Sequence, residues 1–280
     1  MKRSFSSKEP KQPPSIMEGF EGMKEFWKRC VDRAPTYEKY KHANVLSPSA
    51  FPFTRRWGPV QFAMLQLPTL TEIDLFEFLE GAQMASELVT RTFYDEDFRK
   101  YALSLPRLSR KALFDNTGEF YEAVQALEAQ EEPDCVKMMR KGVSEVCFEA
   151  VIFSIQNSKN TKHTVELCEL DVDRMYLENV GFRIVPQSIL QESRAFRTYA
   201  CENNSQEGPE TADTIQDDIK EEVLELRVIS RSKEHIKVYA DGNHKQLTLP
   251  NRASWAFASC VTTPEQLDWR IAGIRHHTVV

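Results

Sequence analysis

The residues that could carry chemistry are few and widely spaced in this 280-residue sequence. His276 and His277 are adjacent, and neighbouring side chains of an extended strand point to opposite faces, so the pair cannot chelate one metal ion. Asp171 and Asp173 would share one face of a strand and could hold a cation, but no third oxygen ligand lies nearby. We therefore predict a solvent-exposed tail at the histidines, a solvent-exposed turn at the aspartates and no metal site.

Motifs for phosphate binding, zinc proteolysis or acyl transfer are absent. The chain has no Gly-x-x-x-x-Gly-Lys, Gly-x-Gly-x-x-Gly, His-Glu-x-x-His or Gly-x-Ser-x-Gly sequence. Its six cysteines include no Cys-x-x-Cys pair, which argues against a zinc ribbon and favours reduced intracellular thiols. We predict no catalytic residue and no cofactor. A small pocket enzyme is the alternative, but no Asp, Tyr and His group for acid–base work can be assembled from the sequence.

The charge of the chain is acidic but unevenly placed. There are 36 Lys and Arg against 42 Asp and Glu, a net charge of −6, which argues against bulk nucleic-acid binding and predicts no direct DNA binding. The segment Cys201–Glu222 holds eight acids and one lysine, enough to account for the whole excess. We predict a disordered acidic insert at 201–222 and a nearly neutral remainder. No apolar run approaches the ~20 residues that span a bilayer.

Residues 1–18 predict a flexible basic tail. Lys2, Arg3, Lys8 and Lys11 face the single acid Glu9 within the first 16 residues, and no apolar stretch could serve as a secretory signal. The basic, serine-rich composition is that of the end of a mitochondrial presequence. An ordinary basic tail is the other interpretation.

Residues 19–69 predict an amphipathic helix followed by an irregular apolar strap. In Gly19–Ala34, apolar side chains recur every three or four residues and the cations occupy the other face, as in helices that bind a membrane surface or a partner. A helix docked on its own domain has the same pattern. From Tyr37 to Pro68, prolines interrupt regular structure. The candidate contact residues of the helix are Phe20, Met23, Phe26, Trp27, Lys28 and Arg29.

Residues 70–280 begin with helices. The apolar spacing predicts a long helix over Asp74–Tyr94, with Asp74 and Glu77 as a capping pair. Gly81 in its middle costs ~1 kcal/mol relative to alanine, which predicts the close approach of another backbone. Further helices are expected to begin at Ser104 and to end near Pro133.

After Gly142 the apolar period changes from that of a helix to that of a strand. An order of helices followed by strands predicts an α+β fold, with N-terminal helices packed on a curved, mostly antiparallel sheet. Asp241-Gly242 predicts a hairpin turn. The expected strands are 146–155, 163–170, 181–185, 223–230, 235–239, 255–261 and 269–274.

Two short motifs of this domain carry a resemblance. Glu80-Gly81-Ala82 stands in the long helix, and Asp268-Trp269 with Ile271 opens the last strand. Over about residues 70–275 this combination resembles the C-terminal domain of the import-motor scaffold of the mitochondrial inner-membrane translocase, the Tim forty-four-like domain. Within that superfamily the chain looks most similar to the family of m-AAA protease-interacting proteins. The acidic insert departs from the family pattern.

The resemblance implies a cone-shaped Tim forty-four-like domain without catalysis, located in the mitochondrial matrix and peripheral to the inner membrane. The implied partners are the m-AAA protease, the matrix face of the inner membrane and newly imported inner-membrane proteins. The regulator subunit of the calcium uniporter is one such client of the family, which assists its sorting and maturation. The alternative within the superfamily is a membrane anchor of the mitochondrial ribosome.

Overall fold

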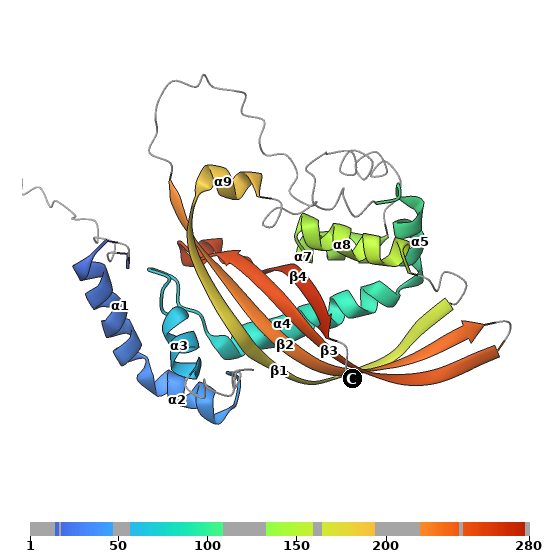
Figure 1. Cartoon of the computed structure of the whole chain (residues 1–280), viewed down its shortest axis with the longest axis horizontal. Coiled ribbons are helices and arrows are strands. Elements are labelled where there is room, and N and C mark those ends of the chain that lie inside the picture. Colours follow the sequence, from blue (N-terminus) through green and yellow to red (C-terminus); the bar gives the residue numbers. More distant parts are fainter. Residues whose placement is uncertain are drawn as a thin grey trace, which may run out of the picture.

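The computed structural model describes residues 15–16, 18–46, 57–108, 133–158, 164–193, 219–240 and 243–277. Its elements form a mixed α+β arrangement in which helices precede most of a four-stranded antiparallel sheet (Figure 1). In chain order they are α1 (Phe20–Asp32), α2 (Ala34–His42), α3 (Trp57–Met64), α4 (Leu75–Tyr94), α5 (Glu96–Ser104), α7 (Asp134–Gly142), α8 (Glu145–Gln156), β1 (Thr164–Pro186), α9 (Gln187–Glu192), β2 (Lys220–Ala240), β3 (Asn243–Cys260), the 3-10 helix η1 (Pro264–Gln266) and β4 (Arg270–His277).

The sheet has the order β1-β2-β3-β4, and every neighbouring pair is antiparallel. β1 and β2 are each one long strand where the sequence predicts two. In β1, irregularities after Leu167, Val172 and Leu177 shift the register without ending the pairing with β2. Such bulges bend a strand, and the sheet is curved in Figure 1. β2 and β3 pair as far as Ala240 and Asn243, while the predicted turn between them lies outside the described residues.

The long helix α4 lies along one face of the sheet, and its prediction is confirmed (Figure 1). The Asp74 carboxylate caps it by accepting hydrogen bonds from the backbone N–H groups of Phe76 at 2.8 Å and Glu77 at 3.4 Å. Phe78 and other buried side chains of its inner face join the core with β2 and β3, where the ring of Phe78 meets that of Phe257 edge to face at 5.5 Å. The helix α4 therefore packs against both the sheet and other helices.

The segment 146–155 is the helix α8, and the strand expected there is wrong. The Ser144 hydroxyl accepts a hydrogen bond from the Cys147 N–H at 3.3 Å and begins the helix. Apolar residues cover most of α8 and are buried against α5 and the sheet, so the segment has no polar face to reveal a helical period. The helix expected to begin at Ser104 does not begin there, because α5 ends at that residue and 105–108 are not helical. Residues 109–132, which hold the remaining expected helix, lie outside the described residues.

The strap is more regular than its prolines suggest, since it contains α2 and α3. Pro35 occupies the first turn of α2, where its missing N–H costs nothing. The strap joins the edge of the sheet: the Leu177 N–H donates to the Val45 carbonyl at 2.7 Å, and Gln61 Nε2 donates to the Glu178 carbonyl at 2.6 Å. Thus α1, α2 and α3 form a helical group at one end of the sheet (Figure 1).

The last three residues of the expected acidic insert, Lys220–Glu222, belong to β2. Glu221 and Glu222 are buried there, because hydroxyl and backbone donors surround their carboxylates. Ile219 directly precedes this strand, and residues 201–218 of the insert lie outside the described residues. Of the expected basic tail at 1–18, residues 1–14 and 17 also lie outside them. Within the described residues, none of the helices combines the length and the apolar content needed to cross a membrane.

Candidate functional site

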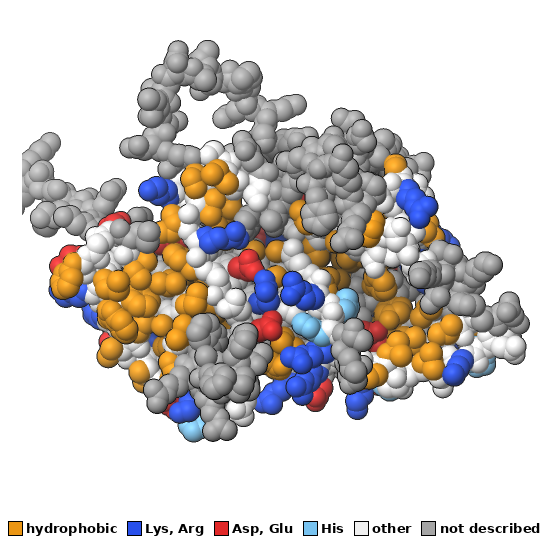
Figure 2. All heavy atoms as spheres, in the orientation of Figure 1, with side chains coloured by type: hydrophobic (Ala, Val, Ile, Leu, Met, Phe, Trp, Pro, Cys, Tyr) orange, Lys and Arg blue, Asp and Glu red, His pale blue; other side chains and the backbone are white. Residues whose placement is uncertain are grey.

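The contact residues predicted on α1 divide between two faces of the helix. Phe20 and Trp27 are 81% and 59% exposed, and Met23 is exposed beside them. Phe26, by contrast, is only 8% exposed and its ring meets that of Trp27 edge to face at 5.5 Å, so its expected role as a contact residue is wrong. The helix is docked on its own domain and still presents an apolar outer face. Figure 2 shows apolar side chains gathered over this end of the molecule.

The arginine of α1, Arg29, and the one that follows the helix, Arg33, are turned toward the rest of the protein. Arg29 Nη1 donates to the carbonyls of Pro68 and Thr69 at 2.7 and 2.8 Å, and burial lowers the pKa of Arg29 against the opposing effect of Glu222. Arg29 is thus a docking residue, which corrects its predicted role. Arg33 pairs with Glu72 at 2.8 Å.

The two lysines of α1 stay exposed, but each has an acidic neighbour one turn earlier. Lys24 lies 3.7 Å from Glu21, and Lys28 lies 3.8 Å from Glu25. The predicted basic face is therefore balanced by acids or turned inward. The outer surface of α1 is apolar and close to neutral.

The first motif of the resemblance lies on α4. Glu80 and Gly81 are exposed and Ala82 is buried. A Cβ placed on Gly81 would meet nothing within 4 Å, so the predicted close approach of another backbone is wrong. The glycine instead lines a hollow in the surface.

The second motif lies where the chain enters β4. Asp268 accepts hydrogen bonds from the Arg270 guanidinium, the shorter at 2.6 Å. Trp269 immediately precedes the strand and packs on Phe78 with ring centroids 4.8 Å apart. Ile271 is part of the core, and its carbonyl accepts from the Ser144 N–H at 2.9 Å. These residues hold β4 against α4 and α8.

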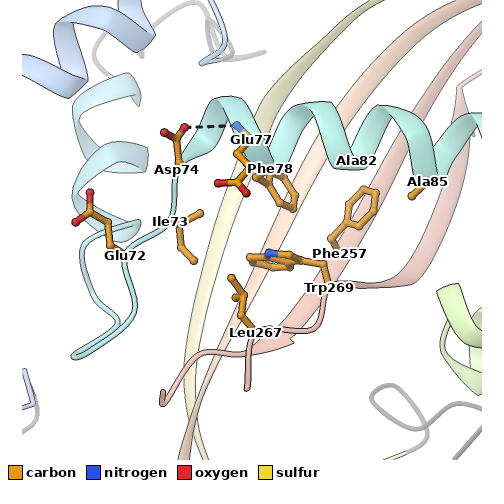
Figure 3. Close-up of a pocket in the computed structure, with 11 residues that line it drawn as sticks. Glu72, Ile73, Asp74, Glu77, Phe78, Ala82, Ala85, Phe257, Leu267 and Trp269 are labelled. Atoms are coloured by element: carbon orange, nitrogen blue, oxygen red, sulfur yellow. Dashed lines mark hydrogen bonds between the residues drawn. The ribbon is translucent and has the colours of Figure 1, made fainter. Parts of the chain in front are cut away.

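The hollow beside Gly81 is a cavity of about 420 Å³ between α4 and the end of the sheet (Figure 3). Rings of Phe78, Phe257 and Trp269 gather under α4. Glu72 and Glu77 are on its lining. The cavity joins both motifs and could hold an apolar side chain, with acidic groups at its rim.

A larger cavity of about 780 Å³ lies between α4, α8 and the strands β3 and β4. At its lining, the Tyr94 hydroxyl donates to Glu234 Oε2 at 2.6 Å and Asn251 Nδ2 donates to Glu234 Oε1 at 2.6 Å. Burial, together with the hydrogen bond to Glu234, raises the pKa of Tyr94. We call this group the Glu234 cluster. Sequence reasoning missed it, because Tyr94 and Glu234 are 140 positions apart and neither stands in a motif.

The histidine pair belongs to this cavity and not to a free tail, which corrects the expectation for that segment. In the pairing of β3 with β4, His276 lies opposite Ala253 and His277 lies opposite Arg252. Asp171 and Asp173 lie within β1 and not in a turn, and Asp171 is 3.5 Å from His235 Nε2. Across the described residues, no three His, Cys, Asp or Glu side chains gather as metal ligands.

Comparison with known proteins gives no match, whether with protein-family models, with curated proteins or with solved structures. The resemblance to the Tim forty-four-like domain therefore remains a prediction from the residues that carry it.

Proposed function

We propose that this chain is a non-catalytic adaptor of the mitochondrial matrix with a Tim forty-four-like domain. In this proposal it binds the m-AAA protease at the matrix face of the inner membrane. It assists the sorting and maturation of newly imported inner-membrane proteins, such as the calcium uniporter regulator subunit. The observation that carries the proposal is the exposed apolar face of α1 on a helix that is firmly docked.

The geometry of α1 supports a macromolecular partner. Phe20, Met23 and Trp27 are one helical turn apart and form a continuous exposed stripe, which is the pattern of a helix that enters an apolar groove. Large apolar side chains grouped on a surface mark interaction sites more often than scattered ones do.

The charges of α1 favour a protein groove over an anionic surface. Binding to acidic lipid or to RNA draws its strength from unpaired cations, whereas Arg29 and Arg33 are turned inward and both lysines have acidic neighbours. The ribosome-anchor alternative, which needs contact with an RNA-rich surface, is supported less for the same reason.

The test is recovery of the m-AAA protease with the full chain purified by affinity from mitochondria. We expect the double variant Phe20→Ala with Trp27→Ala to lose most of the recovered protease and of the newly imported inner-membrane proteins. Met84→Ala, which removes an equally exposed apolar side chain from α4, is the matched control and should retain both. Failure of the unaltered chain to recover either class would overturn the proposal.

The Glu234 cluster favours a second candidate, the small pocket enzyme. A carboxylate and a tyrosine in a cavity of this size are groups that acid–base catalysis uses. The two candidates separate on Glu234→Gln. A catalytic carboxylate predicts that this variant still recovers the m-AAA protease but no longer supports client maturation, whereas the adaptor proposal predicts that both are kept.

A further inference from the structure

The large cavity between α4, α8 and the sheet has the dimensions of a small-molecule site. Its volume of about 780 Å³ lies within the range of ligand pockets, roughly 300–1,000 Å³. Its walls are mainly apolar: Val89 and Phe93 come from α4, Val151 from α8, and Trp255 and Ile274 from the sheet. An apolar body of moderate size would be removed from water there.

The polar groups of these walls are largely satisfied within the protein. The Thr90 hydroxyl donates to the Ser86 carbonyl at 2.8 Å, and the Trp255 indole N–H donates to the Ser230 hydroxyl at 2.9 Å. Neither donor therefore requires a partner from a ligand. His277 also lines the cavity, and its Nε2 is buried without a hydrogen-bond partner among the described residues. The apolar walls select by shape and contact, and the Glu234 cluster places a carboxylate among them.

Glu234 places a carboxylate on the lining of this mainly apolar cavity. Its side chain is only 6% exposed, and both its oxygens accept hydrogen bonds from neutral donors, Tyr94 and Asn251. Among the described residues it forms no ion pair with lysine, arginine or histidine. A buried carboxylate is costly unless it is paired, so a cation placed beside Glu234 would interact favourably with it.

We propose that this cavity binds a small amphipathic amine, an apolar body with one ammonium group placed beside Glu234. The ammonium supplies the missing positive charge, and the apolar body fills the space between α4 and α8. A ligand with a terminal carboxylate is rejected by like-charge repulsion, and an uncharged alcohol gains only the apolar contact. This site is separate from the outer face of α1, so the inference does not depend on the adaptor proposal.

The probes are decylamine, decanol and decanoate, which share one chain length and differ in the charge of the end group. Each is titrated into the purified full chain by calorimetry, below its micelle-forming concentration and at pH 8. At that pH decylamine carries a positive charge and decanoate a negative one. We expect decylamine to bind with 1:1 stoichiometry, at least about tenfold more tightly than decanoate and more tightly than decanol. Its binding should raise the melting temperature, because a ligand of the folded state stabilises that state.

Two variants test whether the Glu234 carboxylate causes the preference for decylamine. Glu234→Gln removes the charge at nearly constant volume and should abolish the advantage of decylamine over decanol. Tyr94→Phe keeps the carboxylate and should retain the advantage. Equal affinities for the three probes, no binding of decylamine, or a preference that survives Glu234→Gln would each overturn the proposal. If Glu234→Gln does not fold, the comparison of the three probes on the unaltered chain decides alone.

Discussion

The outer face of α1 and the larger cavity between α4, α8 and the sheet both gather apolar side chains. They differ in whether these side chains face solvent or one another, and in charge. On α1 the rings of Phe20 and Trp27 face solvent. Arg29 and Arg33 are instead turned toward the strap and the residues that follow it. In the cavity the apolar walls face each other, and the charged Glu234 remains among them. An exposed neutral stripe suits a large complementary surface, whereas a hollow that contains a charged group suits a small ligand. One chain thus offers two different kinds of recognition.

The largest effect is expected at the cavity, when the side chain that holds α8 in the core is removed. Phe148 is fully buried and stands edge to face against Phe98 at 6.3 Å, on a helix that forms one wall of the cavity. Phe148→Ala should lower the free energy of unfolding by about 3–5 kcal/mol, because it removes a large core side chain and leaves a void. Urea denaturation measures the change. A midpoint close to that of the unaltered chain would show that α8 is held by other contacts.

A smaller and more local effect is expected where α1 is docked. Arg29→Ala removes two hydrogen bonds to backbone carbonyls and should cost about 1–3 kcal/mol. The loss should appear as faster amide hydrogen exchange in α1, with α4 unchanged. Equal acceleration in both helices would mean that the strap and the sheet open as one unit, and the contrast between the two regions would then fail.

The smallest effect is expected on the outer face itself. Trp27→Ala should change the free energy of unfolding by no more than about 0.5 kcal/mol, because that side chain is mostly in solvent. Its neighbour Phe26 is buried, so Phe26→Ala provides the matched comparison and should destabilise the chain clearly more. Thermal unfolding of both variants measures the difference. Equal melting temperatures for the two would remove the distinction between the inner and outer faces of α1.

Local patterns predicted two of the helices that have one polar and one apolar side, α1 and α4, whereas α5 and α7 were not predicted. The helix from Asp74 and the amphipathic helix around Trp27 are found where the sequence places them, because capping and a three-to-four spacing are local signals. The helix α8 was misread as a strand because Cys147, Phe148 and their neighbours are apolar on nearly every side. A fully buried helix and a fully buried strand have the same composition over a short segment.

The chemistry of the cavity could not be predicted for a different reason. Tyr94 is the last residue of α4, Glu234 lies in β2 and Asn251 lies in β3. Only the pairing of the strands and the packing of α4 bring these three side chains together. The docking role of Arg29 was hidden in the same way, since its acceptors are backbone carbonyls about 40 positions away. The amphipathic pattern showed that α1 has two faces, but not which residues each face would bury.

The hydrogen bonds of Thr69 have a consequence for the order in which the molecule assembles. The Thr69 carbonyl accepts a hydrogen bond from the Arg29 guanidinium. The Thr69 N–H and hydroxyl donate to the carboxylate of Glu222, a residue 153 positions later in the chain. A chain that emerges N-terminus first exposes α1 long before β2 exists, because contacts between distant positions form only after both partners are present. The exposed stripe of Phe20, Met23 and Trp27 is therefore available from the start. The helix that carries it is held in a fixed position only after β2 has formed. The formation of β2 therefore sets the moment at which this helix becomes a fixed surface.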